Sequence, residues 1–113
     1  MNNTFSEVKL FQVKPAKTQE FEELIKKISA EQKLQEGCLG IKYLKRSHIF
    51  DEISLPPREI SRIIKCVKYY AYWEFDTLEN YGNATKWFFD CYAKDVMKLL
   101  IMPFDINCGY SIE

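Results

Sequence analysis

Two hydrophobic periods follow one another in the first third of the chain. Residues 5–14 (FSEVKLFQVK) are rich in Phe and Val and end at Pro15, a pattern typical of a strand. Over residues 18–35, apolar side chains recur at steps of three and four, which places them on one helical face. Thr18 is the expected N-cap of this helix, and Gly37 supplies the left-handed residue expected after its end.

The rest of the chain predicts three more strands and one more helix. Residues 38–46 and 63–75 are predicted strands, and the second has the strongest β pattern, IIKCVKYYAYWEF. Residues 77–101 predict a long helix with a break near Gly82, and residues 104–112 predict the last strand. The order β-α-β-β-α-β predicts an α+β, ferredoxin-like fold, in which two helices cover one face of a four-stranded antiparallel sheet.

Residues 47–62 form an insertion between the second and third predicted strands. This segment contains Pro56-Pro57 and is much longer than the roughly 2–5 residues of a hairpin loop, so it is of the kind that often carries function. A lid, an additional dimer contact and a mobile loop are all compatible with it. The length of 113 residues predicts one domain, 1–113, that includes this insertion.

Charge and composition exclude several classes of protein. Sixteen Lys and Arg balance sixteen Asp and Glu, which argues against a general nucleic-acid binder and a polybasic membrane-surface protein. The apolar stretch Leu99–Phe104 is far shorter than the roughly 20 residues that span a bilayer. Four cysteines without a CxxC pair and a single histidine argue against a metal site. We expect a reduced, cytoplasmic protein with buried thiols and no signal peptide.

Both faces of the third predicted strand are apolar. One face carries Ile63, Val67, Tyr69, Ala71, Trp73 and Phe75, and the other carries Ile64, Cys66, Tyr70 and Tyr72. Two helices cover only one face of such a sheet, and a face in water normally alternates apolar with polar residues. We therefore expect a homodimer that packs sheet against sheet. The alternative is that the tyrosines are amphipathic surface residues with their hydroxyls in water.

Three segments carry a resemblance to a known family: FQVKPAKTQEFEELIKK (11–27), EGCLGIKYL (36–44) and YYAYWEFDTLENYGNATKWF (69–88). The chain resembles the antibiotic biosynthesis monooxygenase (ABM)-like domains of the dimeric α+β barrel superfamily. The resemblance implies a dimeric α+β barrel and a cofactor-independent oxygenase that acts on aromatic, quinol-type molecules. It implies no cofactor.

A haem-degrading branch of the same superfamily fits the sequence poorly. Its asparagine, tryptophan and histidine fall here on Val8, Gly82 and Tyr92, and none of these can play its family role at the iron. The general ABM pattern also often has a histidine at the position of Gly82. This departure weakens a direct transfer of monooxygenase activity.

His48 is the candidate catalytic residue. It is the only histidine, and its ordinary pKa suits proton transfer near neutral pH. As a general base it would deprotonate a phenolic substrate and prepare it to pass an electron to oxygen. The alternative is a solvent-exposed loop histidine.

Aromatic side chains are the candidate substrate-binding residues. Tyr43, Tyr70 and Tyr72 could line a pocket between sheet and helices or between two sheets, or they could pack a core or dimer interface. Trp87 lies off the apolar seam of its helix, so it needs either a second subunit or a ligand, in which case it forms a lid over the pocket.

Two functional hypotheses follow. The first is a cofactor-free monooxygenase that binds a small aromatic or quinol-type molecule between sheet and helices. The second is a non-catalytic dimer of the same fold that binds a ligand or serves as a scaffold. Whether the protein is an enzyme stays open at this point, because a fold does not determine a function.

Overall fold

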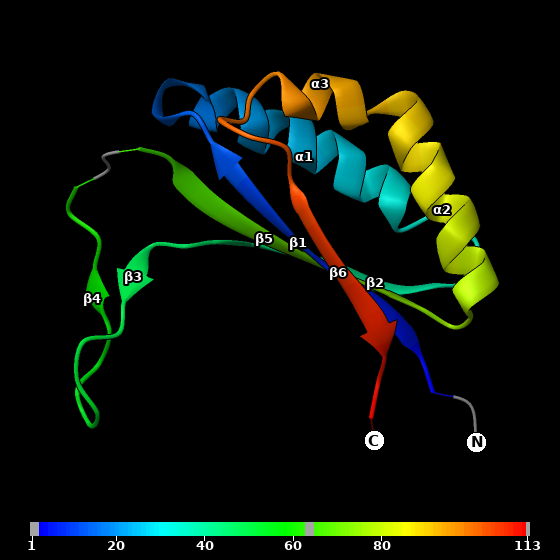
Figure 1. The fold of residues 1–113 in the computed structure, drawn as a ribbon, viewed down its shortest axis with the longest axis horizontal. Helices are drawn as coiled ribbons and strands as arrows, with labels where there is room; N and C mark the ends of the chain where they lie inside the picture. The colour runs from blue at the N-terminus through cyan, green and yellow to red at the C-terminus, as the bar shows by residue number, and fades with distance from the viewer. Residues whose placement is uncertain (1–2, 63–64, 113) are drawn as a thin grey trace.

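The computed structural model describes residues 3–62 and 65–112 (Figure 1). Its elements follow the predicted order, with a short hairpin added inside the insertion. They are β1 (Phe5–Val13), a 3-10 turn (Pro15–Lys17), α1 (Thr18–Gln32), β2 (Cys38–Lys45), β3 (His48–Ile49), β4 (Arg58–Glu59), β5 (Val67–Phe75), α2 (Leu78–Cys91), α3 (Ala93–Met97) and β6 (Asp105–Tyr110).

The main sheet is antiparallel, with the strand order β2-β5-β1-β6. All three helices cover the same face, and the other face is left open (Figure 1). This arrangement confirms the predicted α+β, ferredoxin-like fold. Strands β1 and β5 lie in the middle and pair in register from Phe5 opposite Phe75 to Val13 opposite Val67. Their odd-numbered side chains therefore point toward the helices and their even-numbered ones toward the open face.

The core lies between the sheet and the helices and is largely aromatic. Phe11, Phe21, Trp73, Phe75 and Phe88 are all fully buried. Alternation along β1 and β5 supplies the sheet side of this core, and the apolar stripes of α1 and α2 supply the other side. Burial of these large rings is the main term that stabilises the fold.

Helices α1 and α2 differ from the prediction in where the first begins and where the second is interrupted. Helix α1 starts after a 3-10 turn and its N-cap is Lys17, without a side-chain hydrogen bond, so the predicted Thr18 cap is wrong. The predicted break near Gly82 is also wrong: the helix is interrupted at Tyr92, whose φ is −132°. Gly82 keeps helical backbone on the exposed surface, where a glycine costs only about 1 kcal/mol relative to alanine.

Gly37 occupies the turn between α1 and β2 with a φ of +81°, as its left-handed assignment requires. The helix itself ends earlier than predicted, at Gln32. A Cβ on Gly37 would lie 2.3 Å from Asp76 Oδ1 and 2.5 Å from Asn80 Nδ2. Both the backbone angle and the close approach therefore favour glycine here.

The insertion forms an arm, which we define as residues 47–62. Its strands β3 and β4 pair with His48 opposite Glu59, and Ile60 N donates to Ser47 O at 2.8 Å. The arm projects to the side of the sheet opposite the helices (Figure 1). The 38–46 strand and the 63–75 strand are shorter than predicted, and Ile63 and Ile64 of the latter lie outside the described residues.

Two further features bear on the expectations from sequence. Cys91 and Cys108 are exposed and Cys38 and Cys66 are partly exposed, so the expectation of four buried thiols is wrong. None of the helices within the described ranges is long and apolar enough to cross a membrane.

Candidate functional site

Strand β1 places a pair of opposite charges in the aromatic core. Glu7 and Lys9 are each only 1% exposed, and Lys9 Nζ lies 3.1 Å from Glu7 Oε2. Both side chains point toward the helices because they share the face of Phe5 and Phe11. A buried ion pair is weak evidence for stability, because taking both charges out of water costs about as much as their attraction returns. The pair is therefore a candidate for function.

Helix α2 completes the surroundings of Glu7. The hydroxyl of Tyr81 donates to Glu7 Oε1 at 2.6 Å. Burial, and then the hydrogen bond to Glu7, raises the pKa of Tyr81 above its usual value. Tyr81 consequently stays a hydrogen-bond donor, and the Glu7 carboxylate is held between a phenol and an ammonium group.

Aromatic rings surround the amine of Lys9. Its Nζ lies 3.7 Å from the ring centre of Phe88, 5.4 Å from that of Phe104 and 5.8 Å from that of Trp73. Such faces favour a cation electrostatically. Burial acts in the opposite direction and lowers the pKa of Lys9, while the Glu7 carboxylate partly restores it.

The indole N–H of Trp73 lacks an acceptor. Its Nε1 has no partner among the described residues, whereas the neighbouring Lys9 Nζ is paired with Glu7 at 3.1 Å. Both side chains are at least 99% buried. A buried donor without an acceptor carries the full cost of its lost hydration. An oxygen-bearing ligand between sheet and helices would remove that cost.

Tyr43 belongs to the same layer of the molecule. Its hydroxyl donates to Oε1 of Gln32 at 2.7 Å, and Gln32 is itself buried. Burial raises the pKa of Tyr43 above its usual value. Its ring centre lies 6.3 Å from that of Phe11, so the predicted substrate residue Tyr43 sits beside the aromatic core on the helix side.

The other two predicted tyrosines lie on the opposite side of the sheet. Tyr70 and Tyr72 are half-buried and exposed, respectively, on the open face, where they line a hollow of about 230 Å³ with Val8, Lys42 and Leu44. The sheet separates this hollow from Tyr43. The three tyrosines therefore do not line one pocket within a protomer. Tyr43 lies at the first predicted location, between sheet and helices, whereas Tyr70 and Tyr72 lie on the face that would form the second, between two sheets.

Trp87 and His48 lie in different parts of the molecule, the first on α2 and the second in the arm. Trp87 is half-buried on α2 and packs edge-to-face against Tyr92, with ring centres 5.6 Å apart. His48 is exposed in β3 of the arm, and its Nδ1 lies 2.8 Å from Ser47 Oγ. The substrate role of Trp87 and the catalytic role of His48 stay predictions.

Sequence reasoning missed Glu7, Lys9 and Tyr81. The signal was present: Phe5, Glu7, Lys9, Phe11 and Val13 alternate along one face of the predicted first strand. Two charges inside an otherwise apolar face are expected to be buried together. Within residues 3–62 and 65–112, no group of three or more His, Cys, Asp or Glu side chains is placed so that it could hold a metal ion.

No protein-family model matches the sequence, and no curated protein matches it. Solved structures do match, over nearly the whole chain. A candidate antibiotic biosynthesis monooxygenase from Nitrosomonas europaea is 12% identical with a TM-score of 0.73, and the match covers 99% of this chain and 93% of that one. The chain has the ABM fold.

Two more solved structures are similar to the chain over nearly its whole length. SnoaB, a cofactor-independent oxygenase from Streptomyces nogalater, is 18% identical, with a TM-score of 0.70 and coverage of 99% of this chain and 96% of that one. A dimeric ferredoxin-like protein from an uncultured marine organism is 10% identical, with a TM-score of 0.67 and coverage of 99% and 98%. At these identities the likeness establishes the ABM fold alone.

Proposed function

We propose that the protein is an oxygenase of the ABM kind, which binds a hydroxylated aromatic molecule between the sheet and the helices and oxidises it with dioxygen. The observation that carries this proposal is the charged pair Glu7–Lys9, enclosed by aromatic rings next to an unpartnered indole N–H. The ABM fold, shared with an oxygenase that works without a cofactor, supports the same reading.

The chemistry of the cluster suits a phenolic substrate. Flat rings at Phe88, Phe104 and Trp73 offer stacking surfaces, and Lys9 Nζ offers a positive charge to a phenolate oxygen. Glu7 lies 3.1 Å from that amine and accepts the substrate's hydroxyl proton. Deprotonation makes the ring electron-rich enough to reduce dioxygen.

The overall reaction balances without a further reductant. The substrate ring carbon loses its hydrogen and forms a bond to one oxygen atom of dioxygen. The second oxygen atom leaves as water, and it takes both the C–H and the O–H hydrogens of the phenol. One phenol and one dioxygen thus give one quinone and one water. The four electrons come from the substrate, and the chain's own groups hold the charge and move the proton.

The ring of Phe104 lies where a substrate would enter the space between sheet and helices. It is half-buried in the loop before β6 and contacts both the buried ring of Phe88 and the exposed ring of Phe89. Displacement of this one ring opens a way from solvent to the Lys9 amine. Tyr43 and Trp87 keep their predicted roles as substrate-binding residues in this layer. His48 keeps its predicted role as the catalytic base, and Glu7 is now proposed beside it for the same role.

Oxygen uptake with hydroxylated naphthalenes and anthrones tests the proposal. We expect uptake that depends on the protein, and a loss of more than about tenfold in Glu7→Gln, which keeps the shape of the side chain and removes its basicity. Gly37→Ala is the control, because it destabilises the protein outside the cluster. The proposal fails if the wild-type protein consumes no oxygen with any of these compounds while binding them.

The same assay decides the role of His48. If His48 is the base, His48→Ala lowers turnover by more than about tenfold. Its exposure and its single described side-chain partner, Ser47, mean that the substitution leaves the fold intact. Unchanged turnover removes His48 from the mechanism and leaves Glu7 as the base.

We also propose that the open face of the sheet packs against a second copy of the chain. Val8, Leu44 and Tyr72 are 42%, 53% and 44% exposed there. Exposed apolar side chains in neighbouring strands favour a partner surface. A dimer of this kind places Tyr70 and Tyr72 between two sheets, the second of their predicted locations.

Sedimentation equilibrium tests this dimer at micromolar protein. Wild-type protein is expected to sediment as a dimer and Tyr72→Lys as a monomer, because two lysines would face each other across a dry interface. Lys94→Gln on the exposed surface of α3 is the control and should stay dimeric. A monomeric wild-type protein contradicts the proposal.

A further inference from the structure

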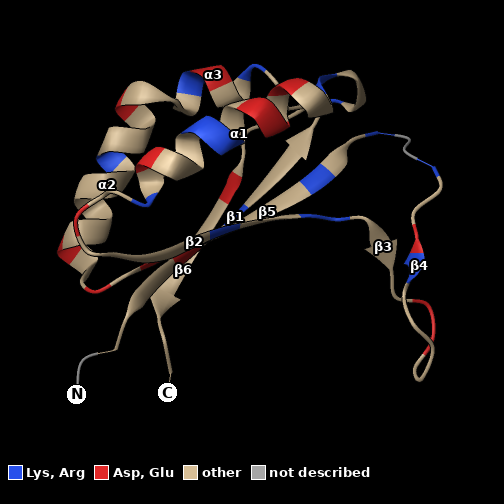
Figure 2. Cartoon of the chain, turned by 180° about the vertical axis from the view of Figure 1, so that it is seen from behind, with Lys and Arg blue, Asp and Glu red and all other residues tan. Residues whose placement is uncertain are grey.

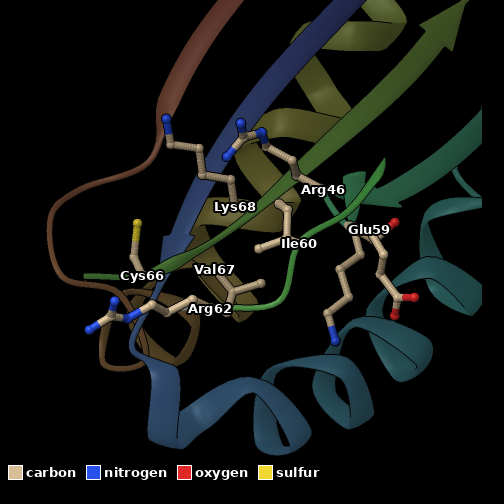
Figure 3. Close-up of a pocket in the computed structure, with 9 residues that line it drawn as sticks. Arg46, Glu59, Ile60, Arg62, Cys66, Val67 and Lys68 are labelled. Atoms are coloured by element: carbon tan, nitrogen blue, oxygen red, sulfur yellow. The ribbon is translucent and has the colours of Figure 1, made fainter. Parts of the chain in front are cut away.

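A pocket lies away from the proposed oxygenase site, where the arm leaves the sheet. It has a volume of about 450 Å³ and is lined by the end of β2, the start of β5 and the two segments that lead into and out of the arm (Figure 3). The arm is fixed at its base, because Ile60 N donates to Ser47 O at 2.8 Å and Arg46 N donates to Lys68 O at 2.9 Å. The pocket is therefore a feature of the fold and large enough for a small ligand.

Positive charge is concentrated at this pocket. Arg46, Arg62 and Lys68 line it, and within the described residues none of the three forms an ion pair. Lys45 also lines it but pairs with Glu22 at 3.0 Å. Figure 2 shows basic residues gathered on both connections between the sheet and the arm. The chain as a whole carries equal numbers of basic and acidic residues, so this concentration is local.

Two of these cations lie at the same end of the sheet: Arg46 directly follows the last residue of β2, and Lys68 is in β5. The backbone hydrogen bond between Arg46 and Lys68 makes them cross-strand neighbours, and their side chains extend in the same direction (Figure 3). Like charges at such positions repel and destabilise a sheet. An anion bound between them removes the repulsion and gains charge-assisted hydrogen bonds from the guanidinium group.

The rest of the lining indicates what kind of anion fits. One carboxylate, Glu59, lines the pocket, on the side opposite Lys68 in Figure 3. Arg46 and Lys68, which extend in the same direction, together carry two positive charges, and these match a doubly charged phosphate monoester. Ile60 and Val67 add apolar surface between the charged ends. The ligand thus has a phosphate group and a small apolar body.

We propose that this pocket binds a small organic phosphate, with the phosphate held between Arg46 and Lys68 and its apolar body against Ile60 and Val67. The inference goes beyond the proposed oxygenase function, because the phosphate lies at the base of the arm and makes no contact with Glu7 or Lys9. Binding at this pocket is measured without turnover, so its failure and the failure of the oxygenase proposal are distinguishable.

Isothermal titration calorimetry with phenyl phosphate, inorganic phosphate and phenol tests the proposal. At low salt we expect saturable binding of phenyl phosphate, weaker binding of inorganic phosphate and none of phenol at this pocket. Arg46→Gln and Lys68→Gln should each weaken the binding of phenyl phosphate by at least about tenfold. Lys94→Gln removes the same charge from exposed α3 and should change the affinity less than about twofold.

Three results overturn the proposal. The first is no saturable binding of phenyl phosphate to the wild-type protein. The second is equal weakening by Lys94→Gln and Lys68→Gln, which would show general attraction by surface charge. The third is a short single-stranded RNA that binds more tightly than phenyl phosphate and depends on the same residues, which would assign the pocket to a polyanion. The melting temperatures of Arg46→Gln and Lys68→Gln, equal to or slightly above that of the wild-type protein because one repelling charge is removed, show that both substitutions leave the fold intact.

Discussion

Removal of one charge from the buried pair Glu7–Lys9 has a large predicted effect on stability. In Lys9→Met, the Glu7 carboxylate stays 1% exposed and keeps only the hydrogen bond from Tyr81. Loss of one member of a buried ion pair generally costs 3–5 kcal/mol. Burial already lowers the pKa of Lys9, so the ammonium group is itself costly in the folded state. We therefore expect the lower end, about 3 kcal/mol.

The reverse change and the double change complete the cycle. Glu7→Gln leaves the amine of Lys9 without its carboxylate, but this amine can release its proton, so we expect a smaller loss of about 2 kcal/mol. In the double variant Glu7→Gln/Lys9→Met no buried charge remains, and the total loss should be about 1 kcal/mol or less. The two single losses together exceed the loss in the double variant by about 4 kcal/mol, which is the expected coupling energy.

Urea unfolding at neutral pH measures this cycle. Trp73 is fully buried with its ring centre 5.8 Å from Lys9 Nζ, so its fluorescence reports directly on the site. The reasoning is refuted if either single variant unfolds within about 0.5 kcal/mol of the wild-type protein, or if the two losses simply add. Either result would mean that the two side chains do not form a coupled, buried pair.

Three other predictions concern stability. Alkaline solution should lower the free energy of unfolding. The pKa values of Tyr43 and Tyr81 are raised, and that of Tyr92 is raised to about 12. Above pH 10 the unfolded chain therefore loses phenolic protons that the folded chain keeps, and stability falls. The tyrosinate absorbance measures this, and full ionisation of the native protein at pH 10 would contradict it. Gly37→Ala should lower the free energy of unfolding by about 2 kcal/mol, because φ is +81° and the added Cβ meets Asp76 and Asn80. A decrease below about 0.5 kcal/mol in chemical unfolding would show that the turn adapts. Thr77→Ala should cost about 1 kcal/mol, because the Thr77 side chain accepts from Asn80 N at 3.1 Å and caps α2; an unchanged melting temperature would show that the cap is replaced by water.

The fold could be predicted from the sequence because its signals are local. Alternation in β1 and β5 and the apolar stripes of α1 and α2 each arise from a period within one segment. The position of the helix break could not be predicted in this way. Gly82 is a local signal for a break, but the observed break at Tyr92 coincides with a contact between distant segments, since the Tyr92 hydroxyl donates to Glu31 of α1.

The candidate site was predicted only in part. Tyr43 lies in the predicted layer, between sheet and helices, but its partner Gln32 and the pair Glu7–Lys9 were not recognised as buried polar groups. Aromatic residues and a single histidine are the most conspicuous candidates in the sequence, whereas the buried polar groups are charges on an otherwise apolar strand face. The hairpin of the arm pairs His48 with Glu59, eleven positions further along the chain. Each of its strands has only two residues, and a strand of that length shows no periodic pattern in the sequence.

A crystal structure of the protein grown with a dihydroxynaphthalene tests the central claim most directly. We predict electron density for the ring between the sheet and the helices, with a substrate oxygen within hydrogen-bonding distance of Lys9 Nζ or Trp73 Nε1 and with Phe104 displaced. The indole N–H of Trp73 would then have an acceptor, or the Lys9 amine a second partner besides Glu7. Density only on the open face beside Tyr70 and Tyr72, or at the base of the arm, with Lys9 still enclosed by its rings, would contradict the account.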